Sequence, residues 1–239
     1  GCCVTRANLK RMPLLQAYYS KAGPHEAITM AGVSHFELAF NEIYDCDKEG
    51  IDAKQASKFG KIHHNYIHDN NRQSIYVDGY PFYLPNFDNR TIKDGVHNIP
   101  EYQGVTYNAS RLDVILELYP GDSLRTDSIK DIEVYHNIVH DGSMGIVVSS
   151  EGGTPVDNVS IHHNLVYNNR NAGIHIASYF GQDGPRSNIN VMNNTVYRSG
   201  YEKEYNWSTG GIYLETSNIR HVVIQNNICK SNGVFQIAE

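Results

Sequence analysis

An asparagine recurs at one position of an internal repeat, and this feature constrains the fold more than any other. Six repeats align on the asparagines Asn41, Asn65, Asn137, Asn164, Asn194 and Asn227. An aliphatic residue lies three positions before each asparagine, and an apolar residue lies two positions after it. An isoleucine follows at 9 or 10 positions in five repeats and at 18 in the other. Units this short cannot bury a core alone, so the repeat indicates a stacked architecture.

The spacing inside each repeat predicts three short strands separated by turns. Side chains alternate along a strand, and stacking the repeats buries the inward set in one continuous core. No segment shows the helical period of ten or more residues that βαβ units need. At the roughly 4.8 Å spacing of paired strands, Asn amides can bond from coil to coil as a ladder. We therefore predict an all-β parallel β-helix of six or more coils, right-handed as in the known examples of this fold.

The chain divides into a short irregular start and one long repeat region. Residues 1–32 are expected to be irregular or to form an incomplete coil, and residues 33–239 to form the β-helix. Two insertions interrupt the repeats, at about 80–128 and 198–209. The first contains an apolar stretch, 114–118, that is typical of a strand and could belong to an extra coil. The last strand has no polar cap, which solenoids normally carry, so we expect a piece of a longer protein.

Composition excludes several classes of protein. The 239 residues contain no run of 18 apolar residues, so no membrane-spanning segment is expected. The formal net charge is -6, which argues against a dedicated nucleic-acid binder. Four cysteines in a chain of this length do not indicate a disulfide framework. The first residues lack the charged start and apolar stretch of a signal peptide.

Outward side chains of the third strand should stack into two columns along the helix. The first column contains Asp52, Tyr76, Val147, His175 and Tyr213, and the second contains Lys54, Asp78, Ser149, Ala177 and Glu215. Glu151 follows the strand of the third coil. A solvated sheet face is usually polar, so any one of these residues alone would ordinarily be an exposed residue without a function. Several carboxylates beside a long insertion favour a sugar-binding groove instead.

Hydrolysis of a glycosidic bond requires two carboxyl groups, one ionised and one held protonated. If the second and third coils are neighbours, the Cα atoms of Asp78 and Glu151 lie roughly 8 Å apart by strand geometry. This range covers both the retaining and the inverting arrangement. An extra coil inside the first insertion would separate the two residues.

One coil resembles a known family of enzymes. The segment Gly60-Lys61-Ile62-His63-His64-Asn65-Tyr66-Ile67-His68-Asp69, followed by Ser74-Ile75-Tyr76-Val77-Asp78, is similar to the catalytic coil of the β-helix β-xylosidases, which are glycoside hydrolases. The resemblance implies that Asp78 is the nucleophile. The acid/base Glu of that family falls where this chain has Ser149, and Glu151 is the nearest substitute. The repeat itself is shared with pectate lyases and other β-helix proteins.

From these residues and the resemblance, we expect a glycoside hydrolase that acts on a plant or microbial oligo- or polysaccharide. The resemblance implies an extracellular or periplasmic location and no cofactor. Asp78 and Glu151 are the expected catalytic residues. The residues expected to bind substrate are Asp52, Lys54, Tyr76, His175, Tyr213 and Trp207.

Two other functions remain open from the sequence. A polysaccharide lyase would abstract a proton beside a uronate with Lys54 as base, and Ca²⁺ would bind among Asp45, Asp47, Glu49 and Asp52. A non-catalytic module would bind sugars through Tyr201, Tyr205 and Trp207, whose ordinary role is to pack the second insertion.

Two histidine pairs, His63-His64 and His162-His163, resemble metal ligands. Zinc needs three or four converging ligands, and the spacing fixes no third one. We therefore predict no metal site.

Overall fold

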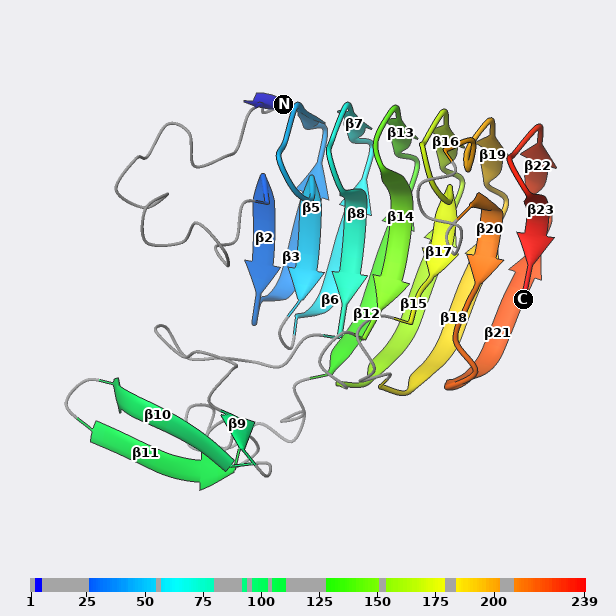
Figure 1. The fold of residues 1–239 in the computed structure, drawn as a ribbon. Coiled ribbons are helices and arrows are strands. Elements are labelled where there is room, and N and C mark those ends of the chain that lie inside the picture. The colour runs from blue at the N-terminus through cyan, green and yellow to red at the C-terminus, as the bar shows by residue number, and fades with distance from the viewer. Residues whose placement is uncertain are drawn as a thin grey trace.

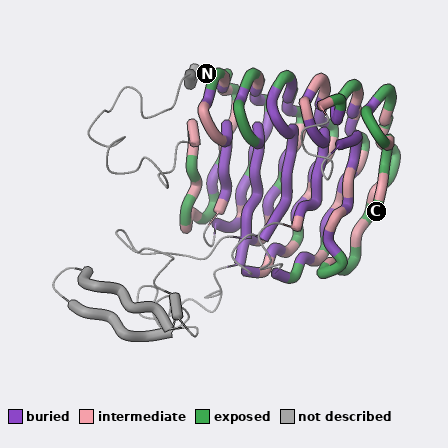
Figure 2. The backbone as a smooth tube through the Cα atoms, viewed as in Figure 1, coloured by how far each residue is buried: buried purple, intermediate pink, exposed green. Residues whose placement is uncertain are grey.

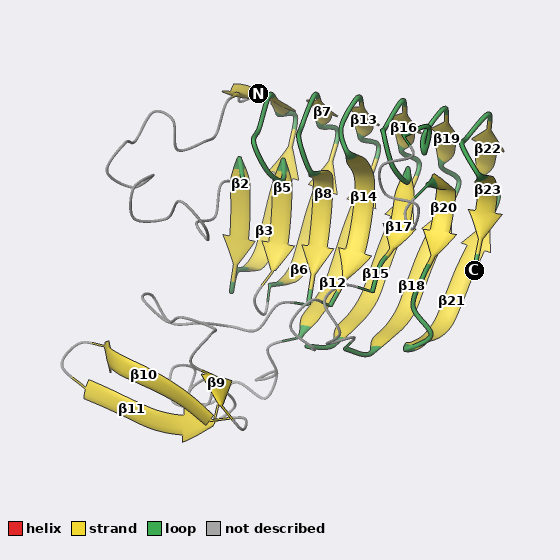
Figure 3. Cartoon of the chain, in the orientation of Figure 1, coloured by secondary structure: helices red, strands yellow, loops and turns green. Residues whose placement is uncertain are grey.

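The computed structural model describes residues 26–54, 57–79, 128–150, 154–178, 184–202 and 209–239. It also gives the backbone of four strands elsewhere in the chain: β1 (Cys3–Thr5), β9 (Ile92–Lys93), β10 (Val96–Tyr102) and β11 (Val105–Ser110). The described residues form strands, turns and loops (Figure 3), and no helix among them is long and apolar enough to cross a membrane.

Three parallel sheets run side by side along the molecule (Figure 1). Sheet A contains β1, β4 (Glu42–Tyr44), β7 (Tyr66–His68), β13 (Ile138–His140), β16 (Leu165–Tyr167), β19 (Thr195–Tyr197) and β22 (Ile228–Lys230). Sheet B contains β2 (Ile28–Ala31), β5 (Ile51–Lys54), β8 (Gln73–Asp78), β14 (Met144–Ser149), β17 (Ile174–Ile176), β20 (Gly210–Leu214) and β23 (Phe235–Ala238). Sheet C contains β3 (Ser34–Ala39), β6 (Lys58–His63), β12 (Ile129–Tyr135), β15 (Val156–His162), β18 (Arg186–Met192) and β21 (Ile219–Gln225).

Each coil passes through sheets C, A and B in turn, which confirms the predicted parallel β-helix with three strands per coil. The apolar columns of the repeat pair residue to residue between neighbouring coils. In sheet B the paired isoleucines are Ile28, Ile51, Ile75, Ile146, Ile174, Ile212 and Ile237. In the first to fifth coils these side chains are fully buried, and Figure 2 shows the buried strands at the centre of the stack.

The asparagine ladder forms as predicted, and Asn137 illustrates it. Its Nδ2 donates to Asn164 Oδ1 at 3.0 Å and to the Ile62 carbonyl at 2.9 Å. Its Oδ1 accepts from the backbone N and from Nδ2 of Asn65, both at 3.0 Å. The side chain is 1% exposed, so each of these bonds satisfies a group that water cannot reach.

A second polar ladder, not predicted from the sequence, lies at the turn between sheets A and B. The backbone N of Cys46 donates to Asn70 Oδ1 at 3.1 Å, and the Ser199 N donates to Asn232 Oδ1 at 3.0 Å. Gly142 N donates to Asn169 Oδ1 at 3.2 Å. Because the position holds Cys, Gly and Ser as well as Asn, no conserved column marks it in the repeat.

The residue before each of these second-ladder positions has a positive φ, between 50° and 57°. We call these six residues the turn column: Asp45, Asp69, Asp141, Asn168, Arg198 and Ser231. Asn and Asp tolerate this left-handed conformation better than most residues, and they fill four of the six positions. The turn column therefore presents one outward side chain per coil.

The first insertion adds no coil between the second and third coils. Strand β8 pairs directly with β14, and Asp78 lies opposite Ser149. The backbone of β9, β10 and β11 forms an antiparallel sheet instead. The apolar stretch 114–118 lies outside the described residues. An extra coil would have separated Asp78 from the third coil, and that separation does not occur.

Candidate functional site

The outer face of sheet B carries the two predicted columns in the predicted register. Within β5, Ile51 and Ala53 point into the core, so Asp52 and Lys54 point outward. Asp52 lies opposite Tyr76 on β8, and Lys54 lies opposite Asp78. Further along the stack the first column continues through Val147, His175 and Tyr213.

Most of these side chains are buried, and Lys54 and Tyr213 are half-buried, which corrects the interpretation of them as ordinary exposed residues. Asp52, Tyr76 and Asp78 are 2–3% exposed, and His175 is fully buried. Apolar members of the same face pack into a small hydrophobic cluster of their own: Tyr76, Met144, Val147 and Ala177. Carboxyl groups on this face therefore lie in a poorly solvated environment, where their chemistry differs from that of surface acids.

The first group that the structure brings together consists of two acids, Glu26 and Asp52, that share the ammonium group of Lys54; we call it the acid cluster. Lys54 Nζ lies 2.6 Å from Asp52 Oδ2 and 3.0 Å from Glu26 Oε1. Both carboxylates are nearly buried, with 3% and 5% of their side chains exposed. Among the described residues, the other oxygen of Asp52, Oδ1, is buried and has no hydrogen-bond partner.

The two carboxyls of the acid cluster differ in charge state. Burial raises the pKa of Asp52 to about 7; Lys54 opposes this rise and Glu26 adds to it. Burial also acts to raise the pKa of Glu26, but Lys54 outweighs it and the net pKa is lowered. Near neutral pH, Glu26 is therefore ionised while Asp52 holds a proton for part of the time. Carboxyls with separated pKa values are the arrangement that acid–base catalysis uses.

Lys54 is held in its charged form. Burial alone would lower the pKa of its ammonium group, but Asp52 and Glu26 outweigh that effect and raise it above its ordinary value. A general base must be unprotonated at working pH. The predicted alternative role of Lys54 as a lyase base is therefore chemically unfavourable.

The acidic residues proposed to hold Ca²⁺ do not converge. Glu49 Oε1 lies 3.4 Å from Arg72 Nε, and Asp52 pairs with Lys54. Within the described part of the chain, no three His, Cys, Asp or Glu side chains meet as metal ligands. The His63 ring nitrogens instead lie near His64 (2.8 Å) and the Glu37 carboxylate (2.6 Å).

A second polar group on this face joins His175 to Glu215. His175 Nε2 lies 3.0 Å from Glu215 Oε2, which also accepts from the backbone N of Ser178 at 3.0 Å. The His175 ring stacks on Tyr213 with centroids 5.0 Å apart. Burial lowers the pKa of His175 although Glu215 opposes it, so the ring is neutral at physiological pH. The sequence placed Glu215 in the second outward column, but its pairing with His175 is seen only in the structure.

Asp78 follows Lys54 in the second column and precedes Ser149, whose buried Oγ has no partner among the described residues. The second and third coils are therefore adjacent, which is the condition for the predicted pairing of Asp78 with Glu151. Two predicted site residues, Glu151 and Trp207, lie outside the described residues. Glu26 was missed because it precedes β2, in a segment that shows no repeat.

Comparisons with known proteins support the fold and identify no site residue. The chain matches the family model described as "Right handed beta helix region" over residues 25–196. A second family model, described as "Disaggregatase related", matches residues 156–239. The chain is also 32% identical over 111 residues to the uncharacterized protein YwoF of Bacillus subtilis (strain 168). Those residues are 46% of this chain and 23% of YwoF, so the match spans less than a quarter of that relative.

Proposed function

This chain belongs to the right-handed β-helix family, and from that premise we propose that it is a glycoside hydrolase with its reacting carboxyls on the outer face of sheet B. The family includes glycoside hydrolases, lyases and binding proteins. The observation that carries the proposal is Asp52, a buried carboxyl with a pKa of about 7, one strand away from Asp78. Its environment suits a general acid, and the resemblance of the second coil to β-xylosidases gives Asp78 the role of nucleophile or base.

In the proposed reaction, Asp52 donates its proton to the oxygen of the leaving sugar. Asp78, as a carboxylate, either attacks the anomeric carbon or activates a water that does so. The two residues lie one strand apart and two positions along, so their Cα atoms are about 8 Å apart by strand spacing. That distance lets the carboxyls flank a glycosidic bond. Both carboxyls are almost fully buried, in a medium where charge interactions are strong.

Lys54 and Glu26 support the acid in this scheme. The Lys54 ammonium holds Oδ2 of Asp52, which leaves Oδ1 as the atom available to carry the proton. Glu26 offsets the charge of Lys54 from its other side, and without it Lys54 would lower the pKa of Asp52 further. The protonated state of Lys54 also favours hydrolysis over the lyase alternative, which needs that amine as a base.

The proposal is tested with a panel of neutral and uronate-containing oligosaccharides and aryl glycosides. A hydrolase releases reducing sugar without forming products that absorb in the ultraviolet. A lyase forms unsaturated uronates that do absorb. Release of reducing sugar from neutral substrates is the expected result, whereas ultraviolet-absorbing products, or no turnover of any substrate, would overturn the proposal.

Asp52→Asn should remove the proton donor and leave the ionised carboxylate in place. We expect kcat/KM of the wild type to fall as the pH rises above about 7, because Asp52 then loses its proton. The variant should lose roughly 10²–10⁴-fold on substrates with poor leaving groups, and much less on activated aryl glycosides that leave without protonation.

Glu151 is the alternative candidate for the proton donor, and Glu151→Gln tests it. If Glu151 donates the proton, this variant shows the leaving-group dependence and Asp52→Asn keeps the wild-type pH profile. Initial rates across pH 4–10 with one activated and one unactivated substrate distinguish the two carboxyls.

A further inference from the structure

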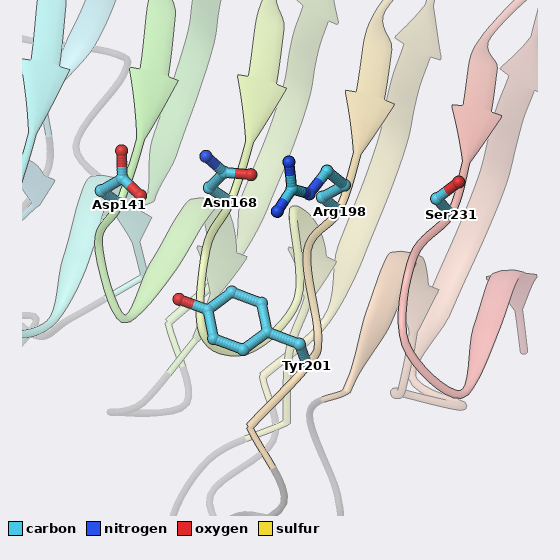
Figure 4. A pocket seen from close by; sticks show the side chains of 5 residues that line it. All are labelled: Asp141, Asn168, Arg198, Tyr201 and Ser231. Atoms are coloured by element: carbon cyan, nitrogen blue, oxygen red, sulfur yellow. The ribbon is translucent and has the colours of Figure 1, made fainter.

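A pocket of about 300 Å³ lies away from the proposed reaction site, at the turn between sheets A and B (Figure 4). It is lined by Asp141, Asn168, Arg198, Tyr201 and Ser231. Four of these are consecutive members of the turn column, one from each of the third to sixth coils. At the strand spacing of a parallel sheet, three coil steps span roughly 14 Å, so the pocket is elongated along the helix axis.

Tyr201 projects beside this row from the second insertion, and its backbone is fixed on both sides. The Gly200 N donates to the Asn169 carbonyl at 3.0 Å, and the Glu202 N donates to the Arg170 carbonyl at 2.9 Å. The Glu202 carboxylate also lies 3.3 Å from Arg170 Nε. The Tyr201 side chain is nevertheless 58% exposed. An exposed aromatic ring on an anchored backbone can stack on a ligand with little loss of entropy.

The polar groups of the pocket balance one another in charge. Arg198 forms no ion pair with the residues that the structure describes, and its guanidinium supplies hydrogen-bond donors to the pocket. Asp141 Oδ2 lies 2.6 Å from His140 Nδ1, which leaves its other oxygen free to accept. Asn168 and Ser231 add uncharged donors and acceptors between and beyond these two. One cation and one anion in the same pocket favour a neutral ligand rich in hydroxyl groups over an ion.

We propose that this pocket is a subsite that binds an uncharged stretch of oligosaccharide, with one sugar ring stacked on Tyr201 and its hydroxyls held by Arg198, Asn168 and Asp141. The choice of carbohydrate as the ligand class rests on the proposed function; the pocket itself does not. The subsite would anchor a polymeric substrate, and small glycosides that occupy only the reaction site would not use it.

The test compares the wild type with Tyr201→Ala and Arg198→Asn by native electrophoresis in gels that contain soluble xylan, soluble β-glucan or polygalacturonate. Asn suits position 198 because Asn168 has the same left-handed backbone one coil away, with φ 53° against 52°. Tyr66→Ala and Arg220→Asn are matched controls, since both residues are exposed and neither lines the pocket. Turnover of a small aryl glycoside is measured for every variant.

We expect a neutral polysaccharide to retard the wild type and both controls, and each pocket variant to bind it about tenfold more weakly. Hydrolysis of the aryl glycoside should not change, which separates this proposal from the proposed function. Equal retardation of all variants, retardation by polygalacturonate alone, or no retardation in any gel would each overturn the subsite. If the wild type did not turn over the aryl glycoside but was still retarded more than both pocket variants, the reaction site would fail and the subsite would stand.

Discussion

Asp78→Asn is expected to lower kcat for glycoside hydrolysis by roughly 10²–10⁴-fold or more, with little change in KM. Asn has nearly the same shape as Asp but can neither attack the anomeric carbon nor accept a proton from water. Asp78 points outward from β8 between Lys54 and Ser149, so the substitution leaves the core side of the strand unchanged. Unlike a loss of the acid, the defect should be as large for activated aryl glycosides as for natural linkages.

The matched control for this prediction is Asp69→Asn. Asp69 is a member of the turn column with a 62% exposed side chain, and Asn tolerates its positive φ of 52°. Initial rates, together with thermal unfolding of both variants, separate a chemical defect from a folding defect. More than a tenth of wild-type turnover in Asp78→Asn would remove this residue from the reaction.

Asn137→Ala is expected to destabilise the protein by about 3–5 kcal/mol. The substitution removes the acceptor for the backbone N–H of Asn65 and the donor to the Ile62 carbonyl, and both partners belong to the second coil. Each buried polar group that is left without a partner costs roughly 1–3 kcal/mol. Alanine also leaves the space of the amide unfilled at a position that is 1% exposed.

Asn190→Ala is the control for the ladder. Asn190 lies on β18 between Ile189 and Val191, whose side chains fill the core, so it points outward. Denaturant unfolding should show a change below about 0.5 kcal/mol for this variant. If the two substitutions proved equally mild, the ladder would not be a main source of stability between the second and third coils.

The repeat allowed the fold to be predicted because one physical requirement recurs in every coil. The inward side chains must be apolar, and the buried turn beside them must satisfy its own backbone groups. The recurring Asn marks the buried turn beside the apolar strand, where its side chain satisfies the backbone groups, as at Asn65 and Asn137. The second ladder was not predictable, because Cys46 and Gly142 take part in it through their backbone N–H groups, which almost any residue supplies.

The candidate site was only partly predictable. Alternation along β5 and β8 placed Asp52, Lys54 and Asp78 on one face, because strand periodicity fixes the direction of a side chain. The pairing of Lys54 with Glu26 and of His175 with Glu215 depends on which atoms meet in space. The burial of the face was not predictable either, since a pattern of polar residues on a strand ordinarily indicates solvent.

The direct pairing of β8 with β14 has a consequence for folding and for variation in this region. Ladder partners are 24–33 residues apart in most neighbouring coils, but Asn65 and Asn137 are 72 apart. The entropy of loop closure grows only logarithmically, so the longer loop costs about 0.9 kcal/mol more than a 27-residue one. A segment of this size can therefore be exchanged at the end of β8 with a small effect on stability. The chain can change what it presents beside Asp78 without moving Asp78.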